Sequence, residues 1–311
     1  MSPVDLPSLA ARLPRQPLVR FAPSPTGYLH LGHVANAVCV WGLARALGGR
    51  VLLRLEDHDR GRCRPEYETA LLDDLEWLGL TPDAGTIAEL RAGRSSFRQS
   101  DNDEAYLGFL TRLRATGDVF VCDCSRKDLA AEGGDVPDVE TPYAGRCRSR
   151  GLDDGPGRGV RIRIEPGVER FDDAWLGPQS QEPAVQCGDL LLRDRLGNWT
   201  YQFAVVVDDL RHGIDLVVRG MDLLESTARQ IVLARCLGRT SPPVYLHHPL
   251  IRKVSGEKLS KAAGDTGVRD LRAAGMPPSA VLGRAAHLIG LQEEDRPVEP
   301  GDLAGFFVGR K

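Results

Sequence analysis

Along the first sixty residues, segments with the apolar pattern of a strand stand before and after a segment with the apolar pattern of a helix. A pattern with three- and four-residue steps begins at Val34 and ends at Gly48-Gly49, which predicts a helix. The apolar β-formers of residues 50–56 (RVLLRLE) predict a buried strand that ends at Glu56, and a first strand ends at Arg20. This order is typical of a doubly wound parallel α/β sheet, whose ligands bind beyond the carboxyl ends of the strands.

Similar patterns predict the elements of the remaining chain. Helices are expected over residues 65–79, 100–117 and 223–237, the last capped by Asp222, with further helical patterns over 269–291. Strands are expected over residues 119–125, 160–164, 190–192, 199–207, 215–220 and 244–251. Together they predict an α/β protein with a Rossmann-type doubly wound parallel sheet, an inserted subdomain and a short helical tail.

The predicted domain organisation follows from these elements. The expected divisions are a flexible lead-in (1–17), the first half of the sheet domain (18–117), an inserted subdomain (118–200), the second half (201–255) and a loop with a helical tail (256–311).

Composition narrows the class of protein. The 311 residues are 42% apolar and 27% charged, as in a protein with an ordinary core. No run is long and apolar enough to span a bilayer, and the N-terminus lacks the pattern of a secretory signal, so a cytoplasmic location is expected. The formal net charge of −3 gives no indication that the protein surface as a whole attracts nucleic acid, so any RNA site must be a local basic patch.

The stretch Arg20 to His33 (RFAPSPTGYLHLGH) precedes the first predicted helix and carries the strongest candidate chemistry. Its prolines and Gly27 predict a tight turn, and His30 and His33 lie where that turn becomes the helix. Exposed N–H groups and the positive end of the helix dipole favour an anion such as phosphate there. The alternative is a helix start whose histidines only cap or pack.

Two motifs in this chain resemble the signatures of class I aminoacyl-tRNA synthetases. HLGH resembles the first signature, RFAPSPTG resembles its glutamyl branch, and the downstream Lys258-Leu259-Ser260-Lys261 resembles the second, KMSKS. The resemblance implies that an amino-acid carboxylate attacks the α-phosphate of ATP, with magnesium bridging phosphate oxygens. It implies that His30, Gly32, His33 and Lys261 bind ATP, and that His30, His33, Lys258 and Lys261 are catalytic.

Glutamate carries two carboxylates and one ammonium, so its site needs two cations and an acid. Arg20 and Arg219 can each form a two-pronged pair with a carboxylate, and Glu56 can hold the ammonium. The family resemblance implies that glutamate is bound by Arg20, Phe21, Ala22, Pro23, Ser24, Glu56, Tyr201 and Arg219. Singly, the arginines are also compatible with surface ion pairs, Tyr201 with a core ring and Ser24 with turn chemistry.

Three of the seven cysteines cluster in the predicted insert. Cys122 and Cys124 share one face of a strand, and Cys147 follows after a loop, which suggests a closed structural zinc site. The alternative is two buried thiols and an unrelated surface one. Some glutamyl-branch enzymes carry C-x-C followed by Y-x-x-x-C, and this resemblance implies Tyr143 as the fourth ligand.

The short tail after Lys261 resembles truncated paralogues of the glutamyl branch that lack an anticodon-binding domain. These paralogues activate glutamate without tRNA and attach it to queuosine in the anticodon loop of tRNA-Asp, so ATP, L-glutamate and this RNA are the expected partners of a monomer. The arginines around residues 146–163 are either solvated surface or a grip for tRNA phosphates. The alternatives are a compact glutamyl-tRNA(Glu) ligase, another adenylate-forming enzyme and an inactive RNA-binding module.

Overall fold

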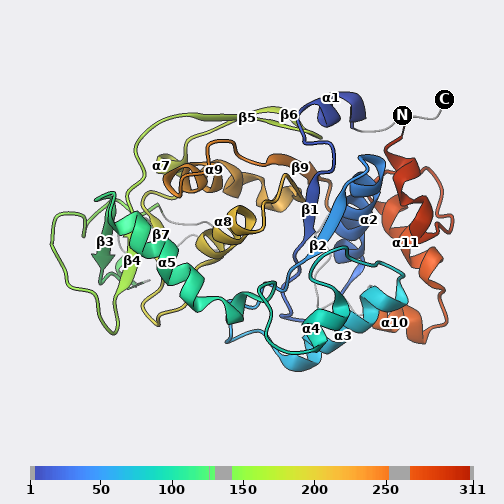
Figure 1. Cartoon of the computed structure of the whole chain (residues 1–311), viewed down its shortest axis with the longest axis horizontal. Coiled ribbons are helices and arrows are strands. Elements are labelled where there is room, and N and C mark those ends of the chain that lie inside the picture. Colours follow the sequence, from blue (N-terminus) through green and yellow to red (C-terminus); the bar gives the residue numbers. More distant parts are fainter. Residues whose placement is uncertain (1–3, 126, 130–141, 252–266, 309–311) are drawn as a thin grey trace.

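The structure is a computed structural model that describes residues 4–125, 127–129, 142–251 and 267–308. Its centre is a six-stranded sheet in the order β2-β1-β8-β9-β5-β6 (Figure 1). The strands are β1 (Leu18–Phe21), β2 (Arg50–Leu53), β5 (Glu169–Asp173), β6 (Gly177–Gln181), β8 (Leu216–Gly220) and β9 (Val244–His248). All pairs are parallel except β5-β6, so the predicted parallel α/β sheet is confirmed apart from this antiparallel pair at its edge.

Helix α2 (Leu31–Ala46) packs in the main core beside β1 and is covered by the C-terminal elements α11 (Pro278–Leu288) and η3 (Pro300–Phe306). The approach is close at Gly42, where a Cβ would lie 2.6 Å from the Phe307 ring and 2.8 Å from the Leu303 carbonyl oxygen. The preceding α10 spans Val268–Ala273. The predicted helical tail is therefore part of the main core.

The predicted flexible lead-in contains a helix, α1 (Leu6–Ala11), whose Leu9 side chain is buried in the main core. The predicted helices over 65–79 and 100–117 are confirmed as α3 (Pro65–Trp77) and α5 (Asp103–Arg114). The short elements α4 (Ile87–Arg91) and η1 (Gln99–Asp101) connect them. These segments carry the chain from the main sheet to the smaller sheet.

A three-stranded antiparallel sheet lies at the far end of the molecule from α11 (Figure 1). It contains β3 (Val119–Cys122), β4 (Gly159–Ile162) and β7 (Leu190–Arg193), and α7 (Pro183–Gln186) precedes β7. A second hydrophobic core joins this sheet to α5, α8 and α9. Strands β5 and β6 also fall within the predicted insert, yet they belong to the six-stranded sheet.

The prediction of a strand over 199–207 is wrong, because the segment is helix α8 (Tyr201–Arg211). The Thr200 side chain accepts a hydrogen bond from the Phe203 backbone N–H and caps the helix. The three consecutive valines from Val205 are buried, so the helix has no polar alternation there that would separate it from a strand.

Two other expectations also need correction. Asp222 does not cap a long helix: η2 (Met221–Ser226) comes first, and α9 (Thr227–Cys236) begins after Ser226. Arg161 is not on a solvated outer face, because it is 7% exposed and its guanidinium lies 4.0 Å from the centre of the Tyr143 ring. Its Nη1 donates to the Asp189 carbonyl oxygen at 2.7 Å, and this bond and the ring contact offset part of the cost of its burial.

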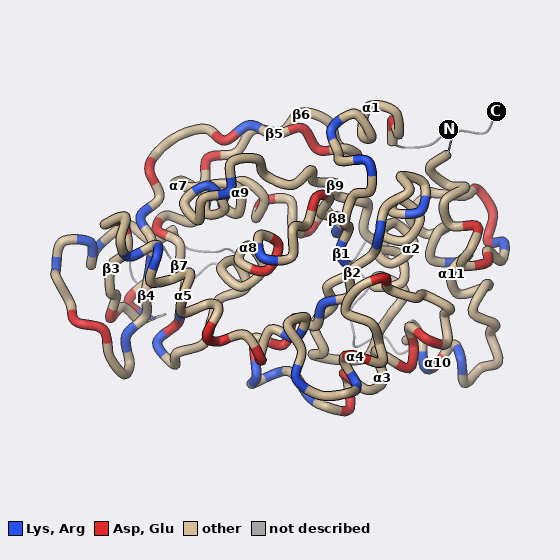
Figure 2. Tube along the Cα trace, viewed as in Figure 1, with Lys and Arg blue, Asp and Glu red and all other residues tan. Residues whose placement is uncertain are grey.

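Basic and acidic residues are interspersed over the smaller sheet (Figure 2). Arg148 pairs with Asp189, Arg150 with Asp123 and Arg163 with Glu165, so these members of the predicted basic patch already have carboxylate partners. The tRNA grip stays a prediction. Within the described ranges, no helix combines the length and the apolar character that crossing a membrane requires.

Candidate active site

A cavity of about 480 Å³ lies beyond the carboxyl ends of β1 and β8. It collects residues from the first-motif turn, the start of α2, the segment after β2, the start of α8 and the end of β8. Of the predicted site residues, its lining includes Arg20, Phe21, Ala22, Pro23, Ser24, His30, Gly32, His33, Glu56, Tyr201 and Arg219. The structure thus brings the predicted ATP-binding histidines and the predicted glutamate-binding residues into one place. Lys258 and Lys261 lie outside the described residues.

The two histidines form the cap of α2. His30 is the N-cap residue, and its Nδ1 accepts a hydrogen bond from the Gly32 backbone N–H at 3.0 Å. His33 Nδ1 accepts from the His30 backbone N–H at 3.2 Å, and the two rings are 4.0 Å apart between centres. Because Nδ1 is the acceptor in both rings, each neutral imidazole carries its proton on Nε2. The ring donors at this helix start are therefore the Nε2–H groups.

Gly32 leaves room for the His30 ring in this cap. A Cβ at residue 32 would lie 2.9 Å from His30 Cε1 and 3.0 Å from His30 Nδ1. A larger residue would push the His30 ring away from the Gly32 amide. The glycine of the HLGH motif therefore allows His30 to fold back over the first turn.

Arg20 is held in the cavity wall by a buried carboxylate from α8. Its Nε donates to both oxygens of Asp209, at 3.2 and 3.3 Å, and Asp209 also accepts from Arg54 Nη1 at 2.8 Å. Burial opposes ionisation of Asp209, but the charges of Arg20 and Arg54 outweigh it and hold the Asp209 pKa below its ordinary value. Asp209 is therefore the ionised partner of two arginines.

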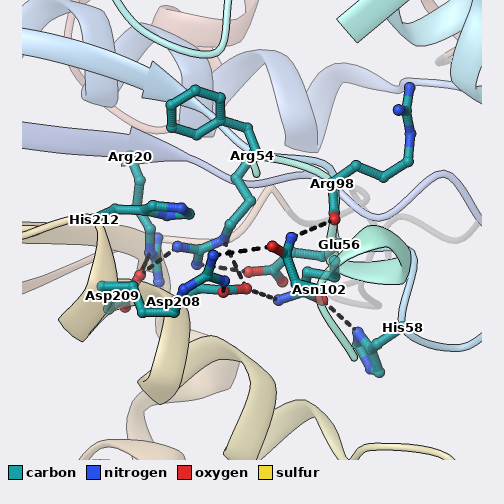
Figure 3. Close-up of polar contacts among 12 residues, drawn as sticks. Arg20, Arg54, Glu56, His58, Arg98, Asn102, Asp208, Asp209 and His212 are labelled. Atoms are coloured by element: carbon teal, nitrogen blue, oxygen red, sulfur yellow. Dashed lines mark hydrogen bonds and ion pairs between the residues drawn. The ribbon is translucent and has the colours of Figure 1, made fainter. Parts of the chain in front are cut away.

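Arg54 links this pair to the predicted ammonium-binding acid (Figure 3). It is 0% exposed, and its Nη2 donates to Glu56 Oε1 at 3.0 Å. Desolvation lowers the Arg54 pKa, but Asp209, Glu56 and Asp208 together raise it above the ordinary arginine value. Glu56 thus enters the cavity as a carboxylate fixed from behind by a permanent cation.

Asp208 extends the network away from the cavity. It accepts from Gln99 Nε2 at 2.9 Å, from the Tyr106 hydroxyl at 2.8 Å and from Arg211 Nη1 at 2.9 Å. Gln99 Oε1 in turn contacts His58 Nδ1 at 2.7 Å, and His58 lines the cavity (Figure 3). Each buried charge in this network has partners, as burial requires.

Arg219 on β8 lies deep in the wall, with an exposure of 3%. Its Nε donates to His247 Nε2 at 2.9 Å, its Nη1 to Gln230 Oε1 at 2.7 Å and its Nη2 to Thr227 Oγ1 at 2.9 Å. All three acceptors are neutral groups. The cation therefore keeps its charge for a ligand in the cavity.

Tyr201 and Ser24 complete the polar wall. Tyr201 is the first residue of α8, and burial raises the pKa of its phenol, so it is a hydrogen-bond donor. Ser24 lies in the turn before α2, with its Oγ 3.9 Å from Cys63 Sγ. Both side chains are placed to make short polar contacts with a small ligand.

The predicted metal ligands form a buried cluster beside the smaller sheet. The Sγ atoms of Cys122, Cys124 and Cys147 lie within 4.8 Å of one another. The Tyr143 hydroxyl oxygen is 3.5 Å from Cys122 Sγ and 3.8 Å from Cys124 Sγ, and it accepts from the Cys147 backbone N–H at 2.9 Å. Burial is the main cause that raises the pKa of the Cys124 thiol to about 12. Four donors from a strand and a loop thus converge on one point.

Arg54, Asp208 and Asp209 support the site from behind the cavity wall, and the sequence analysis did not assign them to it. Two signals pointed to them. Arg54 is the only charge within the otherwise apolar run 51–55, and the acidic pair directly follows an apolar run. A charge placed among buried positions needs a partner, and the structure shows that these charges are partners of each other.

Comparison with known proteins identifies the family. The chain matches the catalytic domain of class I tRNA synthetases (E and Q) over residues 17–297. It is 44% identical over 289 residues to the glutamyl-Q tRNA(Asp) synthetase of Burkholderia cenocepacia strain J2315, covering 91% of each chain. It is 40% identical over 298 residues to the protein of the same name from Nitratidesulfovibrio vulgaris, covering 93% of this chain and 91% of that one.

The fold of the chain is similar to that of solved glutamate-tRNA synthetases. The enzyme of Elizabethkingia anophelis superposes with a TM-score of 0.77 at 27% identity, over 93% of this chain. The present chain spans 65% of that longer protein. The glutamate tRNA ligase of Elizabethkingia meningosepticum, solved in complex with its amino acid, gives a TM-score of 0.76. The chain therefore belongs to the class I glutamyl- and glutaminyl-type tRNA synthetases, within the group of the glutamyl-Q tRNA(Asp) synthetases.

Proposed function

We propose that this chain activates L-glutamate with ATP in the absence of tRNA and transfers the glutamyl group to queuosine in the anticodon loop of tRNA(Asp). One observation carries the activation step: a single cavity holds two buried arginines, a carboxylate and the capped start of a sixteen-residue helix. The choice of RNA follows the two relatives that are named for glutamyl-Q tRNA(Asp).

The ATP phosphates bind at the start of α2 in this proposal. The backbone N–H groups of the first turn and the Nε2–H groups of His30 and His33 donate to phosphate oxygens. Lys258 and Lys261 neutralise the phosphates as charge moves to pyrophosphate, a role carried over from the family resemblance. Magnesium bound with ATP supplies further charge neutralisation.

Glutamate occupies the part of the cavity between β1, β8 and α8. Arg20 and Arg219 each bind one carboxylate of the amino acid, Glu56 binds its ammonium and Tyr201 donates a hydrogen bond. Phe21, Ala22, Pro23 and Ser24 form the wall of the turn. Because both arginines are nearly buried, their charges are poorly screened by water, which favours an amino acid with two carboxylates over one whose side chain ends in a neutral amide.

The cysteine cluster fits one structural zinc ion. Three thiols and a phenol oxygen are a four-donor set, the number of ligands that a closed structural zinc site uses. Cys122, Cys124, Tyr143 and Cys147 would hold the ion and thereby tie the loop after β3 to the smaller sheet. Zinc supplies cross-linking there and takes no part in glutamate activation.

Pyrophosphate exchange separates the proposed function from its main alternative. The purified chain is assayed with each amino acid, with and without tRNA, and glutamate-dependent exchange without tRNA is expected. Exchange that needs tRNA favours a compact glutamyl-tRNA(Glu) ligase, and no exchange with glutamate contradicts the activation step. Transfer is then measured with labelled glutamate on tRNA(Asp) with and without queuosine, and on tRNA(Glu). Label that appears only on queuosine-containing tRNA(Asp) is the expected result.

A further inference from the structure

The guanidinium of Arg219 is fixed by side chains that the proposed glutamate site does not include. Strands β8 and β9 pair in a register that sets Arg219 opposite His247. The two side chains meet through Arg219 Nε and His247 Nε2 at 2.9 Å. Both are buried, with exposures of 3% for Arg219 and 0% for His247.

This contact determines the tautomer of His247. An arginine can only donate, so His247 Nε2 must be the acceptor and the ring proton must be on Nδ1. The Thr227 hydroxyl lies 3.2 Å from the same Nε2 and accepts from Arg219 Nη2, so its own proton is also available to His247. A proton on Nε2 would face two donors.

Asp173, at the end of β5, selects the same tautomer from the other side of the ring. Its Oδ2 lies 2.6 Å from His247 Nδ1, and both side chains are fully buried. Its Oδ1 accepts from the backbone N–H groups of Trp175 at 3.0 Å, Leu176 at 2.9 Å and His247 at 3.3 Å. Asp173 is thus ionised and oriented before any ligand binds, and it accepts the Nδ1 proton.

We propose that Asp173 and His247 are positioning residues that hold Arg219 for the substrate carboxylate. The negative charge of Asp173 is relayed to Arg219 through a neutral imidazole, so no carboxylate of the described residues pairs directly with Arg219. Among the described residues, His247, Gln230 and Thr227 use three of the five N–H groups of Arg219, which leaves two for a ligand in the cavity. The inference rests on the proposed glutamate activation.

The substitution Asp173→Asn tests the tautomer with little change of shape. Three backbone donors hold Oδ1, so the new amide nitrogen takes the place of Oδ2 and becomes a donor toward His247 Nδ1. The ring proton must then move to Nε2, where it opposes the Arg219 donors. Because Arg219 then loses its correctly oriented bond to His247, we expect the KM for glutamate to rise about 10- to 100-fold. The KM for ATP is expected to stay within about twofold.

A second substitution distinguishes a role of His247 in positioning Arg219 from a role in folding. His247→Gln retains an acceptor for Arg219 but loses the ring contact with Asp173, and its glutamate KM is expected between those of wild type and Asp173→Asn. The matched control is His287→Gln on α11, whose Nδ1 contacts the Gln292 carbonyl oxygen and which does not line the cavity. Its kinetic constants in pyrophosphate exchange are expected to equal those of wild type.

A spectroscopic measurement keeps the inference independent of activity. Long-range ¹H–¹⁵N spectra of the histidine rings are expected to show His247 protonated on Nδ1 in wild type and on Nε2 in Asp173→Asn. An Nε2 proton in wild type, or equal rises in the KM for glutamate and ATP, overturns the positioning role. Absence of glutamate exchange in wild type would instead contradict the proposed function, while the ring spectra would still decide the tautomer.

Discussion

Replacement of Asp209 by asparagine removes the buried charge that two arginines share. Asp209 is 7% exposed, Arg54 0% and Arg20 4%, and Asp209 accepts from both guanidinium groups at 2.8 to 3.3 Å. Loss of one partner from a buried ion pair costs about 3–5 kcal/mol, because the remaining charge stays buried. Asparagine keeps one acceptor oxygen, so we expect Asp209→Asn to lower the free energy of unfolding by about 3 kcal/mol.

The matched control is Asp154→Asn, since Asp154 also pairs with two arginines but near the surface. It contacts Arg114 and Arg193 at 2.5 and 2.8 Å, and its side chain is 30% exposed. A surface pair contributes about 0–1 kcal/mol, so a loss of no more than about 1 kcal/mol is expected from urea unfolding. Asp209→Asn should also raise the glutamate KM in exchange, because Arg20 loses its anchor, whereas Asp154→Asn should not.

The pH dependence of the free energy of unfolding is the measurement that can refute this prediction for Asp209. The folded-state pKa of Asp209 is depressed, so its stabilising contribution is complete above the ordinary aspartate pKa and is lost as the pH falls through the folded value. The stability difference between wild type and Asp209→Asn should therefore be constant from about pH 5 to 8 and shrink below about pH 4. Equal losses for both variants, or a difference that grows on acidification, would show that Asp209 is not the ionised partner.

Three further predictions concern other parts of the chain. Gly32→Ala should displace the His30 ring and lower kcat/KM for ATP by about tenfold, while Gly108→Ala, in open space on α5, should leave exchange unchanged. Asp74→Asn should stabilise the chain at pH 7.5 by up to about 3 kcal/mol and much less at pH 4, because burial raises the Asp74 pKa to about 6 and its ionisation costs stability as the pH rises. Cys147→Ser should reduce bound zinc from about one ion per chain to near zero by atomic emission, and a retained full equivalent would exclude Cys147 as a ligand.

The first half of the fold was accessible from the sequence because its elements are bounded by local signals. Gly48-Gly49 ends α2 and Pro65 begins α3, and both bounds are close to those observed. The location of His30 at the start of α2 followed from the turn residues before it. Such signals are contained within a few residues, so no knowledge of distant contacts is needed.

Helix α8 shows where local signals are insufficient. Its valines favour a strand by propensity, and the deciding contacts come from a second core that includes residues of α5, β4 and α9. The error had a consequence for the site. As a strand, residues 204–207 would direct Asp208 and Asp209 to opposite faces, whereas the helix sets both beside Arg54.

The charged residues of the candidate site also explain why composition and motifs identify residues that line the cavity but not the residues that hold them in place. Arg20 and Asp209 are 189 residues apart in sequence, and Arg54 and Asp209 are 155 apart. The residues that line the cavity belong to motifs that resemble a known family, but the residues that fix them lie on strands and helices brought together by the parallel sheet. A motif therefore indicates which side chains meet a ligand. Whether an arginine there is available to a carboxylate depends on its partners. Arg20 is bonded to an aspartate through Nε, whereas the hydrogen-bond acceptors of Arg219 in the described part of the chain are neutral groups. We therefore predict that Arg219 is the stronger of the two candidate anion sites in the cavity.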